Sequence, residues 1–140
     1  MSKIVATSVA LFALVAPSGV LTPPAAAAHG PLPPLVLRAA VTSEHQTPSG
    51  YTLSEALSRG GARVGTSSGS CREAHSANAQ PTSATCRVTL KLTGGTIAIS
   101  FKILFATDSG MLTVVGGTGT YSAARGTGTL ANGMIMIKFE

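Results

Sequence analysis

Strict alternation of apolar and polar residues is the feature that most restricts the fold of this chain. The segment TIAISFKILF, residues 96–105, places five large apolar side chains on one face. The segments RVTLKL at 87–92 and MIMIKFE at 134–140 alternate in the same way. Because successive side chains of a strand point to opposite faces, this period of two predicts β-strands with one buried face. In 96–105 that face comprises Ile97, Ile99, Phe101, Ile103 and Phe105.

Turn signals rich in glycine separate these segments, as at 60–61, 94–95, 107–110, 116–117 and 131–133. The shorter runs at 35–42 and 111–115 also resemble strands. Only TLSEALSR at 52–59 has apolar residues at helical spacing, and it fits a strand equally well. No long helix alternates with strands, so a parallel sheet is not predicted. Seven or eight short strands with tight turns indicate an antiparallel barrel or sandwich, and a barrel leaves no unpaired edge.

The first 28 residues have the layout of a secretory signal peptide. Lys3 precedes an apolar run from Ile4 to Ala16, and small residues suited to cleavage end near Ala28. The alternative is a membrane anchor, but a run of about 13 residues is shorter than the roughly 20 that a spanning helix needs. We therefore expect a secreted protein with a cleavable signal peptide at 1–28, a flexible leader at 29–34 and one folded domain at 35–140. After cleavage, no stable insertion in a membrane is expected.

Cys71 and Cys86 are the two cysteines of the chain. In an exported protein, two cysteines fifteen positions apart most simply form a disulfide. The alternative is a metal-binding thiol, since His75 lies close to Cys71 in the sequence. A zinc site needs three or four ligands, and no others stand at suitable spacing. The sequence therefore predicts a disulfide and no metal site.

The charged residues are few and are spread along the chain. Loss of Lys3 with the signal peptide lowers the formal net charge from +5 to +4. The basic residues stand singly, with no basic run and few aromatic residues between them. Nucleic-acid binding proteins usually carry a basic stripe with interleaved aromatic residues. Nucleic acid is therefore not an expected partner.

Two glycine-rich stretches imitate functional motifs. In 114–133, GTGTYS and GTGTLA both lack the third glycine of a dinucleotide-binding loop, and no lysine follows as in a P-loop. GTSSG at 65–69 fits G-x-S-x-G with Ser67 as nucleophile, but that motif needs a strand–turn–helix elbow that a short, β-rich chain does not provide. We interpret the glycines as geometric, permitting tight turns and sharply bent strands.

Three segments resemble the allene oxide cyclase-like and dirigent-like β-barrels. GGTGTYSAARGTGTL is similar to the family signature GGTG-x-[FY]-x-x-A-R-G, and TLSEALSRGGARVGTSSGSC and ATCRVTLKLTGGTIAISF are similar to bacterial members. The resemblance implies an antiparallel eight-stranded β-barrel with an apolar central cavity. It also implies cofactor-independent chemistry, in which confinement of a small hydrophobic molecule directs ring closure or stereochemistry.

The resemblance and the residue types together give candidate site residues. Arg125 and Glu44 are the catalytic candidates, because either charge would polarise or steady a substrate, although a structural or solvated role is the alternative for each. Tyr51, Phe101 and Tyr121 are candidates to line the substrate pocket. The leading function is a secreted cyclase or isomerase, and the alternatives are a non-catalytic carrier of an apolar ligand and a purely structural barrel. Whether the protein is an enzyme is left open, and so is a homo-oligomeric state.

Overall fold

A computed structural model describes residues 32–75 and 79–140 of the chain. The predicted signal peptide and residues 29–31 of the predicted leader lie outside the described residues. The strands are β1 (Leu35–Thr47), β2 (Gly50–Arg59), β3 (Ala62–Glu73), β4 (Ser83–Leu92), β5 (Gly95–Leu104), β6 (Ser109–Gly117), β7 (Gly126–Ala131) and β8 (Met134–Phe139), with the short 3-10 helix η2 (Gly119–Tyr121) after β6.

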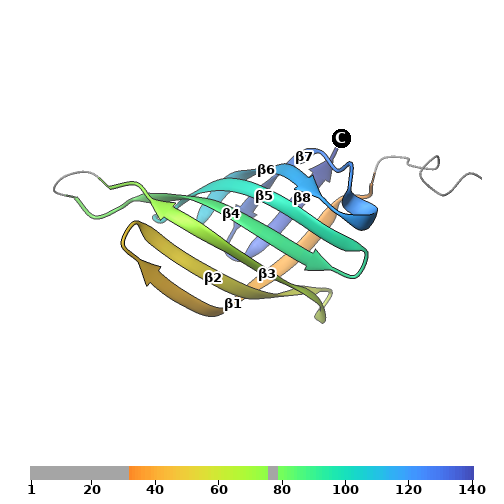
Figure 1. Cartoon of the computed structure of the whole chain (residues 1–140), viewed down its shortest axis with the longest axis horizontal. Helices are drawn as coiled ribbons and strands as arrows, with labels where there is room; N and C mark the ends of the chain where they lie inside the picture. The colour runs from red at the N-terminus through yellow and green to blue at the C-terminus, as the bar shows by residue number, and fades with distance from the viewer. Residues whose placement is uncertain (1–31, 76–78) are drawn as a thin grey trace, which may run out of the picture.

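The eight strands form one closed barrel in sequence order, and β1 pairs with β8 to complete it (Figure 1). Every neighbouring pair is antiparallel. The antiparallel all-β fold predicted from the alternation is therefore confirmed, and so is the eight-stranded barrel that the family resemblance implied. Closure gives each strand two partners, which removes the unpaired edges of an open sheet. Among the described residues, no helix is long and apolar enough to cross a membrane.

The ambiguous segment 52–59 belongs to β2 and not to a helix. Leu57 is fully buried, and Leu53 and Tyr51 pack against the core, so the inward face of β2 follows a period of two. The polar residue Glu55 occupies an inward position between Leu53 and Leu57. It interrupts the apolar alternation, which is why the segment also fits a helical spacing in sequence.

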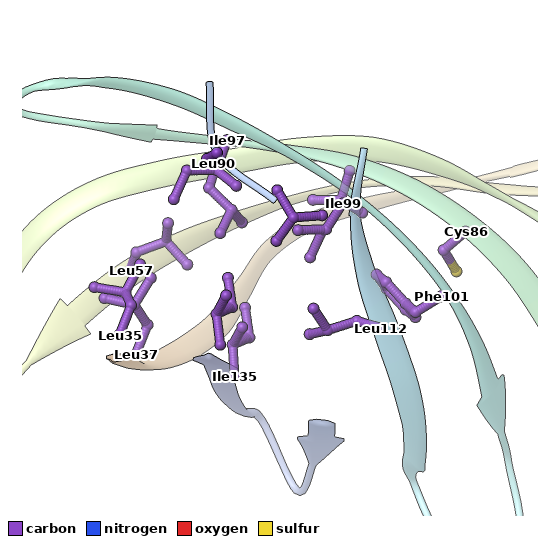
Figure 2. Packing of buried hydrophobic residues seen from close by; sticks show 14 of the residues in the cluster. Leu35, Leu37, Leu57, Cys86, Leu90, Ile97, Ile99, Phe101, Leu112 and Ile135 are labelled. Carbon is purple, nitrogen blue, oxygen red and sulfur yellow. The ribbon is translucent and has the colours of Figure 1, made fainter. Parts of the chain in front are cut away.

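The interior of the barrel is filled by the inward faces of the strands. Figure 2 shows these side chains converging from several strands, among them Leu57, Leu90, Ile97 and Ile99, each at most 1 % exposed. Phe101 also points inward and is 8 % exposed. The prediction for Phe105 was wrong: β5 ends at Leu104, so Phe105 lies in the following turn and is 39 % exposed.

Glycine serves the geometry in two ways. Gly60 and Gly61 have φ values of +58° and +84° and form the β2–β3 turn, a conformation that other residues rarely adopt. In β7, a Cβ on Gly128 would lie 1.9 Å from the carbonyl oxygen of Met136, so β7 and β8 approach each other too closely for a side chain there. Both observations agree with a geometric use of glycine.

The predicted disulfide between Cys71 and Cys86 is present. The two residues lie directly opposite each other on β3 and β4, with both side chains buried on the inward face. The bond therefore ties two neighbouring strands just before they separate into the connection at 74–82.

Candidate functional site

The two ends of the barrel differ in their chemistry. One end carries the connections at 48–49, 74–82, 105–108 and 132–133, and is called the Tyr51 end below. The other carries the connections at 60–61, 93–94 and 118–125, and is called the Tyr121 end. Because consecutive strands are antiparallel, alternate connections fall at opposite ends, and Figure 1 shows η2 far from the β1–β2 hairpin.

A β-bulge decides which side chains of β1 face inward at the Tyr51 end. The pairing of β1 with β2 shifts register between Val41 and Ser43. Beyond this shift, Glu44 lies opposite Leu53, and Gln46 lies opposite Tyr51, so both share the inward face. The amide nitrogen Nε2 of Gln46 donates a hydrogen bond of 3.1 Å to Oε1 of Glu44. The bulge therefore gives the rim of the Tyr51 end a carboxylate and an amide.

A second carboxylate, Glu55, lies deeper in the barrel. It stands opposite Ser67 on β3, and the hydroxyl of Ser67 donates a hydrogen bond of 2.5 Å to Oε2 of Glu55. Ser67 is only 2 % exposed, whereas Glu55 is partly exposed. Ser67 is thus a buried anchor for Glu55, and not the nucleophile of a G-x-S-x-G elbow.

Two further carboxylates complete the group at the Tyr51 end. Glu73 is the last residue of β3 and shares the inward face with Cys71. Nε2 of His75 lies 3.8 Å from Oε2 of Glu73. Asp108 lies in the β5–β6 turn, where its carbonyl oxygen accepts a hydrogen bond from the backbone nitrogen of Asn132.

Tyr51 lies among these carboxylates. Burial raises the pKa of its phenol above the ordinary value of 10.0, and the negative charges of Glu44, Glu73, Asp108 and Glu55 raise it further, in that order. Tyr51 is therefore a neutral hydrogen-bond donor at neutral pH. Four of the five acidic residues of the sequence thus contribute to the raised pKa of this one side chain.

The structure brings three of the five predicted site residues to the same end. Glu44 and Tyr51 lie on the inward face of the β1–β2 hairpin. Tyr51 lies opposite Cys71, Cys71 opposite Cys86, and Cys86 opposite Phe101, so Phe101 is at the same level of the barrel. The three residues thus contribute an acid, a phenol and an aromatic ring to one region.

Arg125 and Tyr121 lie at the Tyr121 end instead. Arg125 is exposed and borders a small cavity of about 80 Å³ together with Leu32, Phe139 and Glu140. Its carbonyl oxygen accepts a hydrogen bond from the backbone nitrogen of Glu140. Tyr121 packs against the core, with its ring 6.2 Å from the ring of Phe139. The structure therefore does not place Arg125 beside Glu44.

Sequence reasoning missed four residues of this region. Glu55 was hidden by its interruption of the alternation in β2, and Ser67 was considered only as a nucleophile. Asp108 was considered only as a triad partner of Ser67, and Glu73 was not considered. The one available signal was that acidic residues are rare in this chain, so each of the five could have been tested for an inward position.

The carboxylates do not converge tightly enough for a metal site. No three acidic, histidine or cysteine residues within 32–75 and 79–140 are grouped as the ligands of one metal ion would be. The negative charge is instead spread around Tyr51 and along the inward face of β2. Such an arrangement suits the charge of a molecular cation better than that of a single metal ion.

Comparisons with known proteins bear on the fold alone. No protein-family model matches the sequence, and no curated protein matches it either. Among solved structures, a pyocyanin demethylase matches with a TM-score of 0.65 at 21 % sequence identity, covering 77 % of this chain and all of the other. The chain thus shares its small barrel fold with that protein. The allene oxide cyclase-like assignment stays a prediction.

Proposed function

We propose that the barrel binds a small organic cation with an apolar body at the Tyr51 end. The observation that carries this proposal is that Glu44, Glu55 and Glu73 share the inward face of β1, β2 and β3, with Asp108 in a turn at the Tyr51 end, in a chain with a net positive charge. Repulsion among like charges makes this grouping costly in the absence of a counter-charge. A bound cation would relieve that repulsion, and an acidic or neutral ligand would not.

The apolar part of the ligand follows from the side chains that lie beside the carboxylates on the inward face. Leu53 and Tyr51 pack on the core cluster, and Phe101 and the Cys71–Cys86 disulfide lie at the level of Tyr51. These groups offer apolar and aromatic contacts to a flat or compact molecule. The structural neighbour that is named a pyocyanin demethylase makes pyocyanin itself one reasonable probe.

The proposal covers the two ligand-binding functions that the sequence suggested, and not the purely structural one. As a cofactor-independent cyclase or isomerase, the barrel would use Glu44 and Glu55 to stabilise positive charge that develops on a confined substrate. As a carrier, it would use the same carboxylates to hold a ligand that is already cationic. We further propose that the protein acts outside the cell, which its disulfide and its predicted signal peptide support.

The test is a calorimetric titration with an N-methylated aromatic cation in the wild type and in Glu44→Gln. Neutralising one of several carboxylates near a bound cation is expected to weaken binding about three- to tenfold. The matched control is Glu140→Gln, which makes the same change at the Tyr121 end and should leave affinity within about twofold. Equal losses in both variants would mean that overall charge, and not the Tyr51 end, attracts the cation.

Recovery of the ligand separates the enzyme from the carrier. After prolonged incubation with the protein, a carrier releases the probe unchanged, whereas a cyclase or isomerase yields a product of the same mass but different retention. If a product forms, its rate should fall in Glu55→Gln and stay unchanged in Glu140→Gln. A product that forms equally fast in Glu55→Gln would remove Glu55 from the proposed chemistry.

A further inference from the structure

The outer face of β3, β4 and β5 gathers basic residues that are far apart in the sequence. Arg72 on β3 and Lys102 on β5 both lie directly opposite Thr85 on β4. Arg87 is two positions from Thr85 along β4, so its side chain points to the same outer face. Diagonal neighbours such as Arg72 and Arg87 lie about 7–8 Å apart. Strand register thus builds a cluster of three cations around one threonine.

These cations are exposed and have no acidic partners. Arg72, Arg87 and Lys102 are all exposed to solvent. The one ion pair within residues 32–75 and 79–140 joins His75 and Glu73, so no carboxylate neutralises the three basic groups. Acidic and basic side chains thus lie on opposite faces of these strands. Glu55 on β2 and Glu73 on β3 face inward, while the three basic residues of the cluster face outward.

The same face is hollowed and rich in hydroxyl groups. A groove of about 530 Å³ is lined by Thr52, Ser70, Arg72, Thr85, Arg87 and Ser100, among others. A second groove of about 280 Å³ begins at Ser70 and Arg87 and continues past Ser68 and Thr89. The two grooves share Ser70 and Arg87, so they form one elongated track across strands that face the viewer in Figure 1.

We propose that this track is a docking surface for a linear polyuronate, that is, an acidic polysaccharide with a carboxylate on each sugar. The guanidinium groups of the arginines can donate two parallel hydrogen bonds to a carboxylate, and the serine and threonine hydroxyls can exchange hydrogen bonds with sugar hydroxyls. An elongated track fits a chain molecule better than a compact ligand. The wider groove also borders Thr47, Ser49 and Tyr51, so the track starts at the Tyr51 end and runs from there along the outer face. The polysaccharide site therefore adjoins the cation site, but it uses outward basic side chains and not the inward carboxylates.

Two other polyanions fit the face less well. Single-stranded nucleic acids stack their bases on aromatic side chains, and the residues lining the track include no outward aromatic ring, since Tyr51 faces inward. Docking on an anionic membrane is aided by exposed apolar side chains. Of the exposed large apolar side chains in the described part of the chain, Val115 alone lines either groove.

The test measures binding of the folded, oxidised protein to immobilised polygalacturonate at low ionic strength. Fully methyl-esterified polygalacturonate serves as the uncharged control. The wild type should bind the acid form, lose that binding as salt is added, and not bind the ester. Absence of binding to the acid form, or equal binding to the ester, would overturn the proposal.

A pair of matched variants locates the binding. Arg87→Gln removes the cation shared by both grooves, and should weaken binding about three- to tenfold. Arg59→Gln makes the same change at an exposed arginine of the Tyr121 end, and should have an effect below about twofold. Equal losses would show a response to net charge and refute the docking surface. Tighter binding to phosphatidylglycerol vesicles, single-stranded DNA or dextran sulfate than to polygalacturonate would refute the polyuronate.

Discussion

Replacement of Ser67 by alanine tests whether Glu55 faces the interior of the barrel. Ser67 is 2 % exposed, and its hydroxyl donates to the Glu55 carboxylate over 2.5 Å. A hydrogen bond to a charged group contributes about 1.5–3 kcal/mol to stability. Because Glu55 is partly exposed, water can replace part of the lost interaction. We therefore expect Ser67→Ala to lower the free energy of unfolding by about 1–2 kcal/mol.

The assay is reversible denaturation of the oxidised protein, followed by far-ultraviolet circular dichroism. For a domain of this size, such a loss lowers the Tm by roughly 5–10 °C. The matched control is Ser68→Ala, the next residue along β3, which is exposed on the outer face and should change stability by less than about 0.5 kcal/mol.

A double-mutant cycle then connects the effect to Glu55. If the two side chains interact, Ser67→Ala and Glu55→Ala together should cost about 1 kcal/mol less than the sum of the single changes. Costs that add to within about 0.3 kcal/mol would refute the contact. A loss in Ser68→Ala as large as that in Ser67→Ala would refute the assignment of inward and outward faces.

Three further predictions concern stability and titration. Replacement of both Cys71 and Cys86 by serine should lower the free energy of unfolding by about 3 kcal/mol, measured against the oxidised wild type, and an unchanged stability would contradict a structural role for the bond. Leu57→Ala, at a fully buried position, should cost about 3–5 kcal/mol in the same assay, and a cost below about 1 kcal/mol would contradict its place in the core. In Tyr121→Phe, Tyr51 is the one remaining tyrosine, and its tyrosinate absorbance should titrate with a pKa above 10.0. Because the folded pKa of Tyr51 is raised, the contribution of its neutral phenol to the free energy of unfolding is complete below pH 10.0 and is lost as the pH rises through the folded pKa. Tyr51→Phe should abolish this loss of stability at high pH.

Local pattern was sufficient for the antiparallel β-fold because most inward positions are large and apolar, but it did not decide between a barrel and a sandwich. The alternating spacing of Ile97, Ile99 and Phe101 is by itself enough to predict the inward face of β5, where all three side chains are buried. The alternation failed where an inward residue is polar, as at Glu55, and where a strand ends, as at Phe105. In both places the burial of a residue depends on its neighbours in space, which periodicity does not encode.

The candidate site was only partly predictable, because it depends on register. The bulge between Val41 and Ser43 turns Glu44 inward, and nothing in the local sequence signals that shift. Glu44 is brought near Tyr51 by the pairing of β1 with β2, whereas Asp108, in the β5–β6 turn, is brought to the same end only by the fold of the whole barrel. The basic cluster on the outer face has the same origin, since Arg72, Arg87 and Lys102 meet through strand pairing alone.

The most direct test of the central claim is a pair of dissociation constants. One is for an N-methylated aromatic cation, and the other is for its neutral, unmethylated parent, both with the wild-type protein. Binding to the acidic Tyr51 end predicts that the cation binds at least about tenfold more tightly, which corresponds to about 1.4 kcal/mol. Equal affinities, or a preference for the neutral parent, would contradict a cation site and favour a simple apolar pocket.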